Sequence, residues 1–149
     1  MNYVIGGTLA TFIGSSVLTH LIDGTIGIIY SSALFARHGT ESNKVIQNIR
    51  IQIEELDIKI KLELVQKLLE TLEKNDINDI LEEGLIELMI KIKSTVEWID
   101  YEIERHLRKW FAGYRSINID DKLNDLRHLV KILDGRINLL MVSGNKKIN

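Results

Sequence analysis

Residues Met1–Ala36 read MNYVIGGTLATFIGSSVLTHLIDGTIGIIYSSALFA, and this stretch decides how the rest of the chain must fold. Its one formally charged residue is Asp23. The whole chain holds 19 lysines and arginines and 21 aspartates and glutamates, so 39 of these 40 charges follow Ala36. An apolar segment of this length has to be covered. The cover is a bilayer, a partner or the chain's own helical bundle, and the sequence leaves these three open.

The first part of this stretch, Tyr3–Ile22, has no formal charge over about twenty residues, enough for a helix to cross a hydrocarbon layer of about 30 Å. Hydroxyl side chains and His20 dilute it, and no basic segment precedes it as in a signal peptide. A carboxylate costs about 2.5 to 3.5 kcal/mol near the centre of a bilayer, which disfavours one span centred on Asp23. We therefore expect a break at Asp23-Gly24 and a second helical piece that ends near Gly39.

Gly6, Ala10 and Gly14 recur every four residues in the predicted first helix. On a helix, this spacing leaves one face almost without side chains, where a second helix can approach closely. The pattern predicts a helix-association face. It is equally typical of a small-residue groove inside an ordinary bundle.

Residues 42–74 contain no glycine or proline, which predicts one long helix. Short alternating runs such as IRIQI also fit strands, but Glu54-Glu55 is poor turn material, and we prefer the helix. Apolar residues form two seams, as expected of a central helix that contacts neighbours on two sides. The first seam is Ile46, Ile49, Ile53, Leu56, Ile60, Leu64 and Leu68, and the second is Ile51, Ile58, Leu62, Val65, Leu69 and Leu72.

Two further long helices follow, each with a single seam. Asn75-Asp76 predicts the start of one that runs to Phe111, and Asn118 predicts the start of the last, which Ser143-Gly144 ends. Ser94 with Glu97 has the spacing of a capping box, which allows a break near Lys93, but the unchanged phase of the seam favours a continuous or bent helix. The sequence thus predicts an all-α fold, an antiparallel bundle of long helices with an apolar, glycine-containing N-terminal helix. We expect one domain over 1–149, made of an apolar region 1–38 and a charged bundle 42–142.

The window 105–115 joins four formal positive charges to three aromatic rings without an acid. Cations suit anionic headgroups, and Trp and Tyr favour the boundary between water and lipid. Antiparallel helices of similar length would return this window beside the start of the second helix, at the end of the molecule that holds the apolar N-terminus. A packed aromatic pair beside a solvated helix end explains the same residues. The predicted lipid contacts are Arg37, Lys44, Arg105, Arg108, Lys109, Trp110, Tyr114 and Arg115.

The amino-acid composition excludes several kinds of chemistry and argues against others. The chain has no cysteine, which removes disulfides, thiolate nucleophiles and cysteine metal sites, and its net charge of -2 argues against general nucleic-acid binding. Its four histidines are scattered, and only Asp125 with His128 has the spacing of a helical carboxylate–histidine pair, where a di-iron bundle needs two such motifs. No phosphate-binding loop, dinucleotide fingerprint or nucleophile elbow occurs. We therefore expect a non-enzymatic protein without a cofactor, metal or specific nucleic acid.

The layout resembles the HeLo-type domains of fungal cell-death proteins and the related four-helix executioner bundle of the necroptosis pseudokinase. The resemblance rests on IGGTLATFIG at Ile5–Gly14, the pair Lys109-Trp110 and LNDLRHLVKILDGRINLL at Leu123–Leu140. It implies a first helix sheltered until activation, which then helps the protein oligomerise with its own copies and permeabilise a membrane, where basic residues meet anionic lipid.

If the first helix inserts, the positive-inside bias leaves the charged bundle in the cytosol. We therefore expect a cytoplasmic or membrane-peripheral protein with an insertable N-terminal helix. The alternatives are a constitutively anchored structural or virion scaffold and a soluble protein-interaction bundle.

Overall fold

The computed structural model of the chain describes residues 7–31, 44–72, 77–109 and 117–145, and within these ranges it contains helices and no strand. The side chains of residues 7–15, 144 and 145 are not described. The predicted all-α fold is confirmed. The helices are α1 (Gly7–Ser31), α2 (Lys44–Glu54), α3 (Ile58–Thr71), α4 (Asp79–Leu107) and α5 (Asp120–Asn145).

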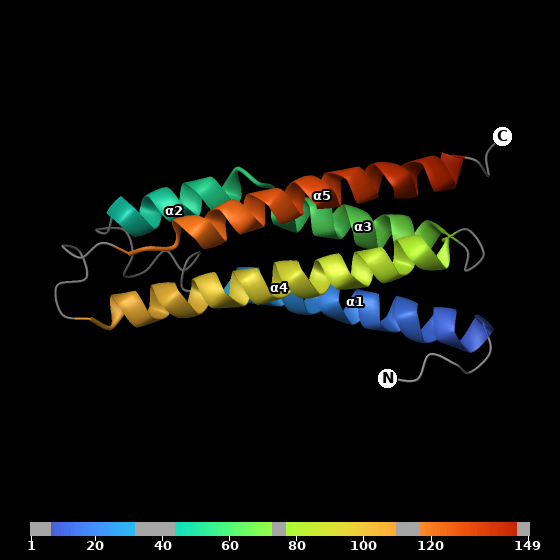
Figure 1. Cartoon of the computed structure of the whole chain (residues 1–149), viewed down its shortest axis with the longest axis horizontal. Helices are drawn as coiled ribbons and strands as arrows, with labels where there is room; N and C mark the ends of the chain where they lie inside the picture. The colour runs from blue at the N-terminus through green and yellow to red at the C-terminus, as the bar shows by residue number, and fades with distance from the viewer. Residues whose placement is uncertain (1–6, 32–43, 73–76, 110–116, 146–149) are drawn as a thin grey trace.

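The helices lie side by side as an elongated bundle (Figure 1). α4 packs against α1 on one side and α5 on the other, and α3 contacts both α1 and α5. α1 and α4 run in one direction, whereas α2, α3 and α5 run in the opposite direction, as expected of an antiparallel bundle (Figure 1). α3 and α4 follow each other in sequence but face each other across the bundle rather than forming a main contact.

Single seams on α4 and α5 form much of the core. α4 is continuous past Ser94, whose hydroxyl donates to the carbonyl of Ile90 at 2.8 Å and caps no new helix. The helix begins after Asn78, later than the predicted Asn75-Asp76, because the Asn78 side chain accepts from the Ile80 amide at 2.9 Å. The predicted seam residues that are buried on these two helices and just before α4 are Ile77, Leu81, Leu85, Leu88, Ile92, Val96, Ile99, Ile103, Leu123, Leu126, Val130, Leu133, Ile137 and Leu140.

α1 continues without interruption through Asp23-Gly24, so the predicted break there is wrong. Asp23 is exposed and accepts a hydrogen bond from the Gln66 side chain of α3. Gly24 faces α4, where an added Cβ atom would lie 3.3 Å from the Cε atom of Lys93. The glycine therefore allows a close approach between two helices instead of ending one. The predicted end near Gly39 lies outside the described residues.

The long helix predicted over 42–74 is divided, and this prediction is also wrong. α2 ends at Glu54 and α3 begins at Ile58, and Asp57 between them has a left-handed backbone with φ of 52°. The amides of Leu56 and Asp57 donate to the carbonyls three residues earlier at 3.1 Å, which tightens the last turn of α2. α5 ends at Asn145, within two residues of the predicted stop.

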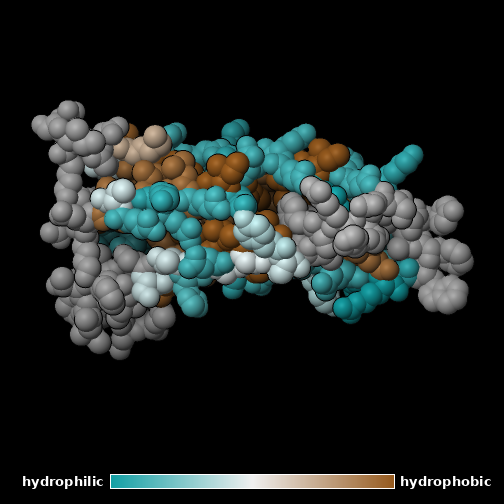
Figure 2. Space-filling model, turned by 180° about the vertical axis from the view of Figure 1, so that it is seen from behind, coloured by the Kyte–Doolittle hydropathy of each residue, from teal (hydrophilic) through white to brown (hydrophobic). Residues whose placement is uncertain are grey.

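The surface retains apolar side chains, which appear as brown areas between hydrophilic ones in the view from behind (Figure 2). The most exposed large ones are on α1, α3 and α4 at Tyr30, Ile60, Tyr101 and Ile80, between 62% and 76% exposed. Most are isolated, which is normal for a globular protein.

Candidate functional site

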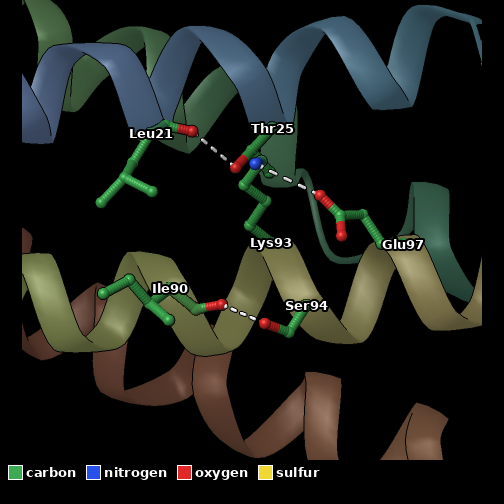
Figure 3. A network of polar contacts seen from close by, with 6 residues as sticks. All are labelled: Leu21, Thr25, Ile90, Lys93, Ser94 and Glu97. Carbon is green, nitrogen blue, oxygen red and sulfur yellow. Dashed lines mark hydrogen bonds and ion pairs between the residues drawn. The ribbon is translucent and has the colours of Figure 1, made fainter.

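The predicted functional element, α1, is held on the bundle by one stripe. Leu18, Ile22, Thr25 and Ile29 are buried at alternating steps of four and three residues, which places them on one helix face. Thr25 is accommodated because its hydroxyl donates to the carbonyl of Leu21 at 2.7 Å (Figure 3). The stripe therefore joins three aliphatic side chains and one hydroxyl whose donor is satisfied within the helix.

Polar contacts flank this stripe. On the side of α4, the Lys93 ammonium lies beside Thr25 and pairs with Glu97 at 3.3 Å (Figure 3). On the side of α3, Gln66 donates to Asp23, and the Lys59 ammonium lies 4.4 Å from the ring centroid of Tyr30. Pairs this exposed contribute about 0 to 1 kcal/mol each, so the apolar stripe is the main attachment of α1.

The outward face of α1 is nearly uncharged. Of the seven exposed residues between Ser16 and Ser31, only Asp23 carries a formal charge. α4 differs, because six of its eleven exposed residues are charged. The low charge of the first helix is therefore not confined to the positions that the bundle covers.

The predicted helix-association face is only partly described. Ala10 and Gly14 belong to α1, but their side-chain surroundings lie outside the described part, and Gly6 precedes it. Close helix approach is observed instead two to three turns later, at Gly24 against Lys93.

The predicted basic end is also partly described, and acids accompany it. Arg105 pairs with Glu102 at 2.9 Å and Arg108 with Glu104 at 3.9 Å, while Lys109 is exposed. These glutamates lie three residues and one residue before the window 105–115, in which no acid was found, which is why the window overstated the positive charge. Arg37, Trp110, Tyr114 and Arg115 lie outside the described residues.

The two predicted sites occupy different ends of the bundle. The end of α4, with Arg105 and Arg108, lies at the same end as the exposed Lys44 at the start of α2, as predicted (Figure 1). The start of α1 lies at the opposite end, because α1 runs parallel to α4 (Figure 1). The expectation that the apolar N-terminus and the basic cluster share one end is therefore wrong.

A cavity of about 500 Å³ opens where the end of α1 meets the joint between α2 and α3. Its walls include Ile29, Ile53 and Ile58, and Tyr30 and Lys59 line it from α1 and α3. Interaction with the Tyr30 hydroxyl, and secondarily the charge of Glu63, raises the pKa of Lys59 above its ordinary value. The cavity thus lies at the contact that ties α1 to α3.

One buried carboxyl was not found by sequence reasoning. Glu82, in the first turn of α4, is only 5% exposed, and its Oε2 atom has no hydrogen-bond partner among the described residues. Burial, and then the charges of Asp79 and Glu83, raise the pKa of Glu82. Its position one residue after the seam residue Leu81 is the sequence signal that could have indicated partial burial.

The carboxylate–histidine pair borders a shallow groove between α4 and α5. Asp125 and His128 lie there with Ser94 and Thr95 in a volume of about 330 Å³. Both hydroxyls donate to carbonyls of their own helix at 2.8 Å, which occupies their hydrogens. Within the described ranges, no three histidine or acidic residues are grouped so that they could hold a metal ion.

Comparison of the chain with family models, curated proteins and solved structures finds no match. Among the described residues, no helix is both long and apolar enough to cross a membrane.

Proposed function

We propose that this protein is a non-enzymatic helical bundle that acts on anionic membranes by releasing α1 from α3 and α4 and inserting it into the lipid. In this proposal the protein is a membrane-permeabilising effector of the cell-death type, and its copies associate on the membrane. The exposed cations of the bundle, including Lys44 and Lys109, make the first contact with lipid headgroups.

The observation that carries the proposal is the uncharged outward face of α1. A helix needed only for folding tolerates charges wherever water covers it, and α4 carries them at six of its eleven exposed positions. On α1, one of the seven exposed residues between Ser16 and Ser31 is charged. A helix that enters the headgroup and acyl region benefits from this difference, because each charge transferred there adds a desolvation penalty.

The mode of attachment supports release. Leu18, Ile22 and Ile29 are the aliphatic side chains that α1 buries in its described part, and each fully buried aliphatic side chain contributes about 1.5 to 3 kcal/mol. Lipid buries the same side chains again, so insertion recovers much of what detachment loses. The remaining helices still contact one another through α4 with α5 and α3 with α5.

A covalent bridge tests the proposal. The chain has no cysteine, so Gly24→Cys with Lys93→Cys gives one specific pair between α1 and α4, at a place where a Cβ atom added to Gly24 would lie 3.3 Å from the Cε atom of Lys93. A short bis-maleimide would hold α1 on the bundle, and a monofunctional maleimide on the same variant is the matched control. Dye release is measured from vesicles of phosphatidylcholine and phosphatidylserine.

We expect release by the control and by the unmodified chain, and little release by the bridged protein. Equal release by bridged and control protein would contradict insertion of α1. No release by any of the three would contradict permeabilisation and favour a protein-interaction bundle. Extraction of the native protein only with detergent would favour the constitutively anchored scaffold.

A further inference from the structure

The cavity where the end of α1 meets the joint between α2 and α3 has the size of a small-molecule site. Its volume of about 500 Å³ lies within the range of about 300 to 1,000 Å³ that is usual for ligand pockets. Ile29, Ile53 and Ile58 line it, and they are 7%, 6% and 3% exposed. One of these isoleucines comes from each of α1, α2 and α3, so the cavity has an apolar floor that exists only where the three helices meet. Such a floor favours an apolar group over water.

The rim of the same cavity is polar and carries charges of both signs. Lys59 supplies one ammonium group, whereas Glu54 and Asp57 supply two carboxylates. Both acids are exposed, and Lys59 is half-buried. Among the described residues, Lys59 forms its ion pair with Glu63, at 3.8 Å, and Glu63 does not line the cavity. An exposed pair of this length is weak, so the charges at the rim are able to bind a ligand.

Tyr30 positions the ammonium group at this rim. The Nζ atom of Lys59 lies 4.4 Å from the centroid of the Tyr30 ring. Interaction with the Tyr30 hydroxyl raises the pKa of Lys59, which keeps the ammonium group charged. The cavity therefore has a fixed cation beside an aromatic ring, above a floor of buried isoleucines.

The charges at the rim distinguish among ligands that have an apolar chain. A fatty acid brings one anion, which attracts Lys59 but is repelled by Glu54 and Asp57. An alkylammonium brings one cation, which attracts the two acids but is repelled by Lys59. A zwitterionic headgroup places a phosphate next to an ammonium group. It can therefore pair with the lysine and the acids together, in charge-assisted contacts of both signs.

We propose that this cavity binds a single-chain phospholipid with a zwitterionic headgroup. The acyl chain lies on the three buried isoleucines, the phosphate faces Lys59, and the ammonium group faces Glu54 and Asp57. The bound molecule contacts α1, α2 and α3 at once. The site goes beyond the proposed insertion of α1 and does not rest on it.

Nuclear magnetic resonance of the isoleucine methyl groups in the full chain tests the site. The probe is lysophosphatidylcholine, titrated below its critical micelle concentration. A fatty acid and an alkyltrimethylammonium ion with the same chain length are the matched comparisons. Ile29, Ile53 and Ile58 report on the floor of the cavity, and the buried Ile77 and Ile137, which do not line it, are internal controls.

We expect saturable shifts at the three floor isoleucines, unchanged controls, and tighter binding of lysophosphatidylcholine than of either comparison. Lys59→Gln should raise its dissociation constant about fivefold. Lys67→Gln, at an exposed position of the same helix outside the cavity, should leave the dissociation constant unchanged.

Three results would overturn the proposal. Absence of saturable shifts would show that the cavity takes no such ligand, and equal shifts at the control isoleucines would show general loosening of the bundle. Equal affinity for the three amphiphiles, or equal effects of the two lysine variants, would show that the charges at the rim do not recognise the headgroup. The bridging test of α1 is unaffected by each of these results, because it measures dye release.

Discussion

Charging the outward face of α1 should separate its role in folding from its role at a membrane. Ser16 and His20 are exposed and one turn apart on this face. Replacement of exposed residues changes the free energy of unfolding by about 0.5 kcal/mol or less, and two like charges four residues apart repel by about 0.2 to 0.5 kcal/mol. We therefore expect the variant Ser16→Lys with His20→Lys to fold with a stability within about 1 kcal/mol of the native protein.

The membrane effect should be much larger. A lysine at the centre of a bilayer costs about 2.5 to 3.5 kcal/mol, and 1.4 kcal/mol corresponds to a factor of ten. Even at the shallower depth of an interfacial helix, two such charges should lower dye release by about tenfold or more. Simple adsorption predicts the opposite sign, because each lysine near an anionic surface gains about 1 kcal/mol. The direction of the change therefore distinguishes insertion of α1 from adsorption of the folded bundle.

Urea unfolding and dye release from vesicles of phosphatidylcholine and phosphatidylserine are the two measurements. A matched control, Ile90→Lys with Ser94→Lys, adds the same two charges four residues apart on the exposed face of α4. We expect this control to retain release. Unchanged or increased release by the α1 variant would refute the insertion of α1, and equal loss in the control would show that added charge acts without regard to location.

Four further changes have defined outcomes. Ile22→Ala removes a fully buried side chain of α1 and should lower the free energy of unfolding by about 2 to 5 kcal/mol in urea titration; a change below about 1 kcal/mol would show that α1 is not tightly packed. Asn78→Ala removes the cap of α4 and should lower it by about 0.5 to 2 kcal/mol, whereas Asn78→Asp should retain it. Glu82→Gln should stabilise the fold at neutral pH. Burial raises the pKa of Glu82 in the folded protein, so the protonated carboxyl contributes stability below the unfolded pKa, and this contribution is lost as the pH rises through the folded pKa. The gain should therefore shrink in urea titrations at acidic pH, and a pH-independent difference would contradict it. Lys44→Gln with Lys109→Gln should weaken cosedimentation with anionic vesicles, more at low salt than at high salt, and salt-independent binding would count against headgroup contact.

The helices with one seam were predictable from sequence because their apolar residues recur every three or four positions, which places all of them on the same helix face. α4 and α5 follow this rule throughout, from Leu81 to Ile103 and from Leu123 to Leu140. The segment with two seams was not predictable in the same way. No glycine or proline marks the joint at Asp57, and its position follows from which face the other helices accept, which is information held outside the segment.

The candidate site shows a similar division. The sequence identified α1 as exceptional from its lack of charge, and this property persists on the exposed face. It misread Gly24 as a helix breaker because local propensity says nothing of an approaching side chain such as Lys93. It also overstated the positive charge of the window 105–115, because Glu102 and Glu104, which lie just before it, each pair with an arginine about one helical turn later.

The attachment of α1 indicates what kind of trigger could release it. Three buried aliphatic side chains at about 1.5 to 3 kcal/mol each approach the total stability of a typical domain, which is about 5 to 15 kcal/mol. In water, detachment of α1 therefore competes with global unfolding, and a soluble signal that breaks only one polar contact supplies too little energy. If α1 inserts as proposed, lipid covers Leu18, Ile22 and Ile29 again as they leave α3 and α4. On this reasoning, we expect the membrane to lower the barrier to the release of α1 as well as to receive the helix.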